Sequence, residues 1–523
     1  MTMAAVRSER GASAEYAQLE ERILARDQVG ASQVLYALLK AGRPVTEIVR
    51  ETVRIHAPYT HVPYHQRLDD GVVRFVNNDH CLLSERVSLP LMSMLAGSLH
   101  YLPLVQTVWY IPTGLDPWNQ LLGRAPGHYT RLYNIAVSQP PPKPEVHWPD
   151  QEPLNMEGAL GERLNHWLTL VQRGEVLTSY RIFLGLMDDV GSRRAVLAQL
   201  AFAGLIDVQD RMLHNRSYTT GHKAYRARAT IELGQALGWE SAHSVLYAGV
   251  PDMAVGSHWY SVWEMAANVC AATFEGRDHD FRDNQGTLSP DEQATLEDAM
   301  LHSHEPEWQN QITALLQAGR GPRQIHDVLQ VAASELMVEC GAPENYSMPQ
   351  HTTEYCNTLR WYFDAFDHPH QVKLLYVAGA MVNTAAHNQA ADPKNGPMTI
   401  GRVPNAEAWD ARRLLNEIDA AMLVRDSDTS LALTSTYLRN GYPQADLVEQ
   451  LAVACAKFGN DPHNQEICLG LIEDYVRSTA NRREVLLYGC IKNLTGYRKY
   501  GDHFEAYNRF AEAFGLPAVA VTP

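Results

Sequence analysis

The sequence predicts an all-α protein made of tandem helical hairpins, and a recurring motif is the first observation behind this prediction. The motif is a histidine followed 23 residues later by an apolar triplet of the Leu-Leu-Tyr type. It occurs four times: at His80 with Pro103-Leu-Val105, at His222 with Val245-Leu-Tyr247, at His351 with Leu374-Leu-Tyr376, and at His463 with Leu486-Leu-Tyr488. Self-similarity of this kind is typical of stacked helical repeats, none of which can bury its apolar face alone.

A second recurring phrase marks the beginning of a copy. Ala-Leu-Leu-Lys-Ala-Gly-Arg at 37–43 returns almost unchanged as Ala-Leu-Leu-Gln-Ala-Gly-Arg at 314–320. Apolar residues at helical spacing precede the glycine, and another apolar residue follows it. Each copy is therefore expected to open with a helix, a glycine break and a second helix. A polar helix at about 13–26 precedes the first copy and is expected to cap it.

The histidine of each copy is expected to begin a third helix, and the apolar triplet belongs to a fourth helix that runs back antiparallel. Polar breaks such as Asp367-His-Pro-His370 separate these two helices. The predicted order is a capping helix at 1–30, repeat 1 at 31–135, a Pro-rich linker at 136–159, repeat 2 at 160–275, a linker at 276–307, repeat 3 at 308–390, a linker with a connecting helix at 391–429, and repeat 4 with the C-terminal tail at 430–523. The four copies are expected to stack like HEAT repeats or to form two halves facing a central cleft.

Charge and hydropathy limit the partners of this chain. The formal net charge of −16 and the lack of a basic run argue against binding to nucleic acid or to an anionic membrane surface. The N-terminal residues lack an apolar signal core, and the chain has no run of about 18 apolar residues. We therefore expect a soluble, cytoplasmic protein. Seven cysteines without a CxxC pair favour reduced thiols over a disulfide framework.

Helix geometry connects the repeats to a metal site. If the chain reverses about 17 to 21 residues after each histidine, the residue 36 positions later lies level with that histidine. Glu354 and Glu466 each follow a repeated histidine at i+3, on the same helix face. They are expected to complete the metal shell or to act as a base. The predicted metal ligands are His80, Asp116, His222, His258, His351, His387 and His463.

Imidazole and carboxylate ligands with few thiolates suit iron, manganese or zinc. We predict a metal-dependent oxidoreductase, namely a non-haem iron oxygenase with a mononuclear or dinuclear site and a small organic substrate. Tyr225, Tyr355 and Trp361 are expected to line its pocket beside the two glutamates, with both tyrosines as candidate catalytic groups. Oxygen activation by ferrous iron usually requires electrons, and the sequence has no flavin or cluster motif. A separate reductase or ferredoxin is therefore a candidate partner.

This plan resembles that of the HEAT-repeat iron hydroxylases such as deoxyhypusine hydroxylase, in which helical hairpins contribute His and Glu ligands to an enclosed iron site. The resemblance rests on His351-x-x-Glu354 and His463-x-x-Glu466 within the repeated hairpins. It implies an iron site between repeats. Because that family has adjacent His-Glu pairs, whereas these pairs are three residues apart, its substrate is not carried over to this chain.

Two other classes of function remain open. A zinc- or manganese-dependent hydrolase or lyase would use the same ligands, whereas a non-catalytic helical-repeat scaffold would use the histidines for capping or polar packing. Haem binding is a lesser alternative, since no CxxCH motif is present. His56, His61 and His65 are expected to lie on a Pro-rich loop. They could close over the site as loop ligands, but a loop without a chemical role is the favoured interpretation.

Overall fold

The computed structural model describes ten segments of the chain: 14–57, 67–69, 72–74, 79–114, 151–208, 221–254, 258–341, 346–458, 462–496 and 504–520. Helices dominate these segments, which confirms the predicted all-α class. One antiparallel pair of short strands, β1 (Arg67–Asp69) and β2 (Val72–Arg74), also lies in the described part. None of the described helices combines the length and the apolar character that crossing a membrane requires.

The described residues contain 22 α-helices. In chain order they are α1 (Ala14–Leu24), α2 (Gln28–Lys40), α3 (Val45–His56), α4 (Asp79–Met94), α5 (Leu102–Gly114), α6 (Leu160–Gln172), α7 (Val176–Met187), α8 (Arg193–Ile206), α9 (His222–Leu237), α10 (His243–Gly249), α11 (Ser261–Phe274), α12 (Pro290–His302), α13 (Glu307–Gln317), α14 (Pro322–Glu339), α15 (Ser347–Ala365), α16 (Lys373–Ala390), α17 (Ala411–Leu423), α18 (Ser427–Arg439), α19 (Gln444–Lys457), α20 (Pro462–Arg477), α21 (Glu484–Gly496) and α22 (Glu505–Phe514). Short 3-10 helices join some of them: η3 (Gly97–Tyr101), η6 (Trp239–Ser241), η7 (Pro251–Ala254), η8 (Asp278–Phe281) and η10 (Ala406–Ala408).

Glycine separates two successive helices where the repeated phrase predicts it. Gly42 lies between α2 and α3 with a φ of +74°, and Gly319 lies between α13 and α14 with a φ of +81°. This left-handed backbone conformation is easily adopted only by glycine, which is why it so often follows the last turn of a helix. The predicted glycine break is confirmed at both positions.

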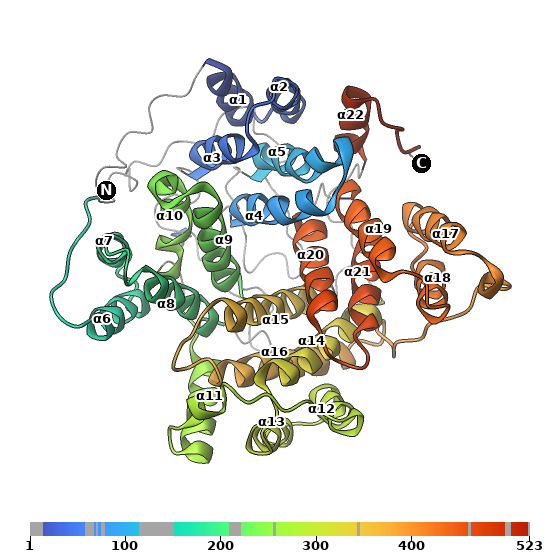
Figure 1. Cartoon of the computed structure of the whole chain (residues 1–523). Helices are drawn as coiled ribbons and strands as arrows, with labels where there is room; N and C mark the ends of the chain where they lie inside the picture. The colour runs from blue at the N-terminus through green and yellow to red at the C-terminus, as the bar shows by residue number, and fades with distance from the viewer. Residues whose placement is uncertain are drawn as a thin grey trace.

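The helices that carry the repeated histidines form a closed ring at the centre of the molecule (Figure 1): α4, α9, α15 and α20. Helix α4 packs against α9 and α20, and α15 packs against the same two helices. Each ring helix also packs against the α-helix that follows it in the chain, which is α5, α10, α16 or α21. The ring makes neighbours of His80 and Glu466, which are 386 positions apart.

The apolar triplets anchor these following helices in the core. Leu375, Leu486, Tyr247 and Tyr376 are fully buried. The Tyr376 hydroxyl lies 2.8 Å from Oγ1 of Thr313 and so keeps a polar partner. Because burying a leucine contributes about 1.5–3 kcal/mol, packing explains why such a triplet recurs.

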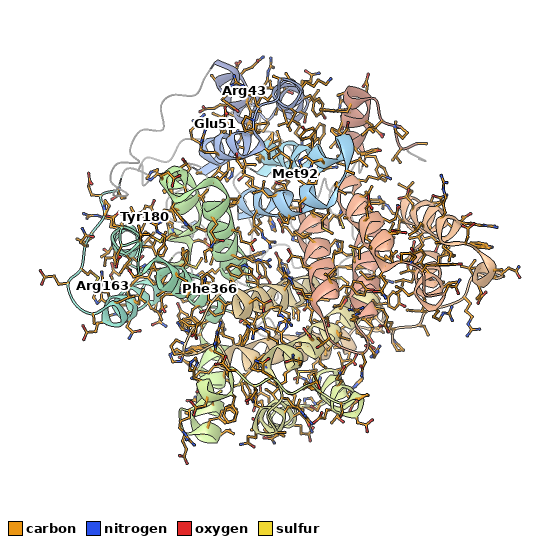
Figure 2. The ribbon with its side chains drawn as sticks, in the orientation of Figure 1. Arg43, Glu51, Met92, Arg163, Tyr180 and Phe366 are labelled. Atoms are coloured by element: carbon orange, nitrogen blue, oxygen red, sulfur yellow. The ribbon has the colours of Figure 1, made fainter. Side chains whose placement is uncertain are left out.

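The remaining helices surround this centre, and Figure 2 shows the charged side chains of Arg43 and Arg163 at the outer rim. Helix α12 lies in the segment 276–307, for which the sequence predicts a linker. Its start is marked by a capping box between Ser289 and Glu292, with Pro290 at the first helical position. These are recognised helix-start signals, so a polar composition does not exclude a helix here.

Candidate metal centre

Four histidines, one from each ring helix, meet at the centre of the molecule and are called the histidine cluster below: His80, His222, His351 and His463. Ring centroids are 4.5 Å apart for His80 and His463, and 4.8 Å apart for His222 and His351. The other two neighbouring pairs, His80 with His222 and His351 with His463, are 5.5 Å and 6.0 Å apart. Each imidazole therefore has two imidazole neighbours.

The cluster forms where ring helices begin. Helix α9 begins at His222, α4 and α20 begin one residue before their histidines, and His351 lies one turn into α15. The positive end of a helix dipole disfavours a charged imidazolium, and metal binding requires the neutral imidazole. His80, His351 and His463 are buried, whereas His222 is partly exposed. The cluster is thus an enclosed set of nitrogen donors with one exposed side.

Within the cluster, Nε2 of His222 lies 3.1 Å from Nε2 of His351. Two imidazole nitrogens that share one ion at about 2.1 Å, with an angle of about 90–110° at the ion, are about 3.0–3.4 Å apart. The same distance suits a hydrogen bond in which one neutral ring donates to the other. The observed spacing is therefore compatible both with shared metal ligation and with a hydrogen bond between the two rings.

Glu466 lies beside His80 and can orient its ring. Nδ1 of His80 is 3.2 Å from Oε2 and 3.5 Å from Oε1 of Glu466, and the Ser84 hydroxyl donates to Oε1 at 3.5 Å. A carboxylate that accepts a hydrogen bond from Nδ1 fixes the tautomer in which Nε2 carries the free lone pair. Glu466 is therefore placed to prepare His80 as an Nε2 ligand.

A narrow cavity adjoins the cluster and is lined in part by Tyr225, Glu354 and Glu466. Its volume is about 10 Å³, which is the room that one water molecule needs. Burial, and then the nearby Glu466 carboxylate, raise the pKa of Glu354 well above its usual range, although Arg86 and Arg228 oppose this. Glu354 thus holds its proton more strongly than an exposed glutamate does, at the edge of the cavity.

Two arginines that sequence reasoning did not identify also line this cavity. Arg86 and Arg228 both form ion pairs with Glu232, and Arg228 additionally contacts Glu473 at 3.0 Å. Burial alone would raise the pKa of Glu232, but the two guanidinium groups lower it to about 2. Fixed charges of both signs therefore surround the cavity. Two sequence signals point to this network: the i,i+4 spacing of Arg228 and Glu232, and the position of both arginines six residues after a repeated histidine.

His258 contacts a buried ion pair instead of the histidine cluster. Its Nδ1 lies 2.8 Å from Oδ2 of Asp207, and Nζ of Lys223 is 2.5 Å from the same oxygen. The Tyr260 hydroxyl is 3.1 Å from the same Nδ1. Helix α10 is only seven residues long, so the chain does not return along α9 by the full length that the 36-residue offset assumes.

His387 lies near the end of α16 and faces a different set of residues. Its Nε2 donates to the backbone oxygen of Ser303 at 2.8 Å, and its ring stacks on His304 with centroids 4.3 Å apart. Being level with His351 does not bring a side chain to the same face, because each residue turns a helix by about 100°. Asp116 lies outside the described residues.

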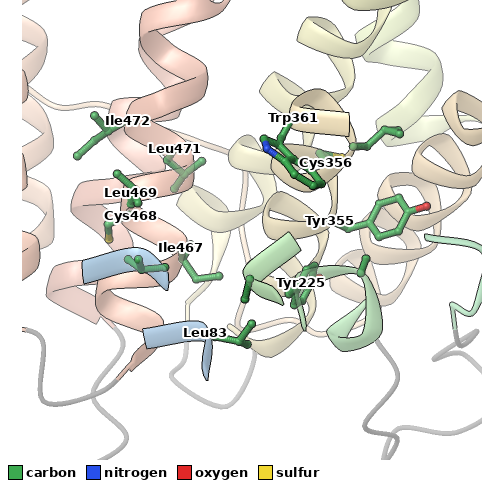
Figure 3. Close-up of a cluster of buried hydrophobic side chains, with 14 of the residues drawn as sticks. Leu83, Tyr225, Tyr355, Cys356, Trp361, Ile467, Cys468, Leu469, Leu471 and Ile472 are labelled. Atoms are coloured by element: carbon green, nitrogen blue, oxygen red, sulfur yellow. The ribbon is translucent and has the colours of Figure 1, made fainter. Parts of the chain in front are cut away.

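The two predicted tyrosines lie on different sides of the ring. The Tyr225 hydroxyl donates to the backbone oxygen of His351 at 2.6 Å, so this residue borders the cluster. The Tyr355 hydroxyl donates to the backbone oxygen of Leu205 at 2.8 Å, and Figure 3 shows its ring pointing away from α20. Trp361 lies beneath the Arg228 guanidinium, 5.3 Å from ring centroid to Cζ. Tyr355 thus joins α15 to α8 within the core.

His56 does not lie on the Pro-rich loop, and that expectation is wrong. Helix α3 continues to His56 and so ends before the first proline of the segment, Pro58. Nε2 of His56 lies 2.8 Å from Oε2 of Glu85 on α4, and both side chains are fully buried. His61 and His65 lie outside the described residues.

Comparison of the chain with protein-family models, with curated proteins and with solved structures finds no match. The chemistry of the site therefore follows from its geometry alone. The cluster combines four neighbouring imidazoles with the Glu466 carboxylate, and Glu354, a carboxyl group of raised pKa, lies at the adjoining cavity. Imidazole and carboxylate are groups that can bind metals and transfer protons.

Proposed function

We propose that the histidine cluster binds one divalent metal ion and that the protein is a non-haem iron oxygenase with a small organic substrate. The observation that carries this proposal is the meeting of four imidazoles from four separate helices, two of them with Nε2 atoms 3.1 Å apart. Neutral imidazole donors favour a transition metal such as iron or zinc over calcium and magnesium, which prefer oxygen ligands.

The number of donors favours oxygen chemistry over a closed structural site. An iron ion held by the four imidazoles would accept further ligands and would supply oxygen activation. A tetrahedral zinc ion would instead be saturated by the same four ligands and would have no position for water or substrate. Because four imidazoles would saturate zinc but not iron, the iron oxygenase is favoured over the zinc hydrolase.

The residues around the cavity have separate tasks in this proposal. Glu354, whose pKa is raised, donates a proton to oxygen or substrate. Arg86 and Arg228 stabilise negative charge that develops in the cavity, since both are held in place by Glu232. Tyr225 is held by its hydrogen bond to the His351 carbonyl and packs beside the reacting atoms.

Electrons are the remaining requirement. Hydroxylation of a C–H bond consumes molecular oxygen, two electrons and two protons, and it yields an alcohol and water. The proposal therefore includes a ferredoxin or a reductase as the electron donor.

We also infer that the chain consists of four diverged copies, each with five helices. This inference is supported by the order of the helices, because every ring helix is the fourth in a series of five: α1–α5, α6–α10, α12–α16 and α17–α21. On this division α1 begins the first copy, and α11 and α22 follow the second and fourth copies.

Elemental analysis tests the metal site, on protein purified without a histidine tag. We expect about one equivalent of iron, lost in His351→Ala and in His463→Ala but retained in the matched control His387→Ala, which alters a histidine outside the cluster. Oxygen uptake by the iron-loaded protein with a chemical reductant then tests the oxygenase. Zinc or manganese in the same pattern would favour a hydrolase or lyase, and no metal in folded, reconstituted protein would leave only the scaffold.

A further inference from the structure

A second group of metal-competent side chains lies apart from the histidine cluster. It consists of one cysteine from each of α19, α20 and α21 and is called the thiol cluster below: Cys455, Cys468 and Cys490. The three side chains are fully buried, and the sulfur atoms all lie within 4.8 Å of one another. The three helices pack against each other in every pairing. The cluster is thus built from the core of one helical unit.

The sulfur spacing is close to that of a three-coordinate metal site. Three thiolates at about 2.3 Å from one ion are about 3.8–4.0 Å apart. The observed limit of 4.8 Å therefore requires each sulfur pair to close by at most about 1 Å. Side-chain rotations of that size leave the three helix axes where they are. The other cysteines of the chain, such as Cys270 and Cys340, are buried without belonging to this group.

The surroundings of the thiol cluster contain a donor suited to a thiolate. Nδ2 of Asn493 donates to the Cys468 sulfur at 3.4 Å, from one turn further along the helix that carries Cys490. The Asn493 side chain is itself held by Gln350, whose Nε2 donates to its Oδ1 at 2.7 Å. Hydrogen bonds from such fixed amides to ligating sulfur orient the ligand and tune the bound metal.

We propose that the thiol cluster binds one thiophilic metal ion, Cu(I) or Zn(II), through three thiolates. Neither carboxylate nor imidazole belongs to the group, so its chemistry excludes hard ions such as magnesium and calcium. A shell of three sulfurs saturates Cu(I), whereas Zn(II) would take one further ligand.

The position of the thiol cluster gives this ion a structural task. Cys468 lies on α20, five residues after His463 and two after Glu466, so an ion at the thiol cluster would tie the middle of this helix to α19 and α21. It would thereby hold the start of α20 in place, together with His463 of the histidine cluster. The inference rests on the three cysteines alone and stands or falls independently of the metal in the histidine cluster.

Metal titration of the whole chain tests the proposal. The protein carries His222→Ala and His351→Ala so that the histidine cluster does not compete, and it is kept reduced and stripped of metal. Cd(II), as a spectroscopic substitute for Zn(II), and Cu(I), displaced from a coloured chelator, are added in separate arms. We expect thiolate-to-metal charge-transfer absorption that saturates at one equivalent, lost in Cys490→Ser and kept in the matched control Cys270→Ser. The metal that binds with the higher affinity shows whether the site prefers Cu(I) or Zn(II).

X-ray absorption on the same His222→Ala, His351→Ala protein, with all cysteines intact, keeps the proposal testable if Cys490→Ser does not fold. With one equivalent of Zn(II) or Cu(I) bound, we expect about three sulfur neighbours at about 2.3 Å. Only nitrogen or oxygen neighbours would overturn the proposal, as would absorption that saturates equally in Cys490→Ser. Failure of both ions to bind the folded protein would overturn it as well.

Discussion

At the scale of single residues, Glu466 would determine which nitrogen of His80 is available to the proposed metal ion. Its carboxylate lies 3.2 Å from Nδ1, on the neighbouring ring helix, and so favours the tautomer with a free Nε2. The i+3 spacing predicts that Glu466 binds metal directly. Its contact with His80, from a distant part of the chain, gives it a second proposed role, which is to orient the His80 ring.

Removing this carboxylate should weaken metal binding without abolishing it. We expect Glu466→Ala to lower the affinity for Fe(II) by about 10- to 100-fold, the usual cost of losing a group that hydrogen-bonds to a ligating histidine. Competition with a coloured chelator measures the affinity. Glu449→Ala, an exposed glutamate on α19, is the control and should bind as the unaltered protein does. Equal affinities in the two variants would show that Glu466 does not contribute to metal binding.

Asp474 gives the protein a predictable dependence of stability on pH. It is buried, and Nε2 of Gln330 donates to its Oδ2 at 2.6 Å. Burial, and then the charge of Glu473, raise its pKa from 3.8 to about 7. Since the folded protein keeps a proton that the unfolded chain releases, the stabilisation is complete below pH 4 and is lost as the pH rises through about 7.

The variant Asp474→Asn should remove this dependence. At about 1.4 kcal/mol per pKa unit, the unaltered protein should lose up to about 4 kcal/mol of unfolding free energy relative to the variant between pH 4 and pH 8. Urea unfolding at several pH values measures the difference. Parallel curves for the two proteins would show that the carboxyl group ionises normally in the fold.

Some residues of the candidate site can be recognised in the sequence, whereas others cannot. The four clustered histidines share one spacing to an apolar triplet, and such a register is visible in sequence. Arg86 and Arg228 each follow a repeated histidine by six residues, a register that is also visible in the sequence. Their shared pairing with Glu232 is not visible there, because it depends on which helices become neighbours. His258 and His387 were placed by an assumed hairpin length, and neither the real length of α10 nor the rotation of α16 is written in the local sequence.

At the scale of elements, glycine breaks limit the helices more sharply than polar composition does. Gly319 has a φ of +81°, and a Cβ added there would meet no atom within 4 Å. Its substitution therefore reports backbone strain alone. Gly161, inside α6 with ordinary helical backbone, also has open space around the Cβ position and is a matched control.

Gly319→Ala should destabilise the protein by about 1–2 kcal/mol, the cost of forcing an L-residue into the left-handed region. Gly161→Ala should be neutral or stabilise by up to about 1 kcal/mol, because alanine is the better helix former. Chemical denaturation of both variants measures these changes. A loss of stability in Gly161→Ala that equals the loss in Gly319→Ala would contradict the role of the glycine break.

Helix type was easier to predict than helix limits. The apolar spacing around the repeated motif indicates helices, and α15 and α16 lie on either side of the predicted polar break at 367–370. Helix α12 was missed because its polar surface obscures the apolar spacing, although its capping box could have been recognised. The end of α3 differs from the prediction because a proline disfavours helical backbone mainly at the residue just before it. Helix α3 therefore extends to His56, two residues before Pro58.

At the scale of the whole molecule, four helices from distant parts of the chain close into one ring. A repeated sequence predicts similar units but does not fix the curvature with which they follow one another, so the meeting of the histidines could not be read from spacing. Contacts such as that between His80 and Glu466 reveal it. A metal ion in the cluster would link parts of the chain that no short loop connects.

Metal binding should therefore stabilise the entire fold. Free metal at about 100 times the dissociation constant adds about 2.7 kcal/mol to the free energy of unfolding when the unfolded chain does not bind. We expect a rise in Tm on adding Fe(II) without oxygen, and no rise in His463→Ala. A similar rise in both proteins would indicate binding elsewhere.

X-ray absorption at the iron edge tests the central claim most directly, because it reports the ligands themselves. For protein loaded with one equivalent of Fe(II), the histidine cluster predicts about four imidazole nitrogens at about the 2.1 Å typical of metal–imidazole bonds. His222→Ala should lower that number, and His387→Ala should leave it unchanged. A shell of oxygen or sulfur without imidazole, or an identical spectrum from His222→Ala, would contradict the proposal that this cluster is a metal centre.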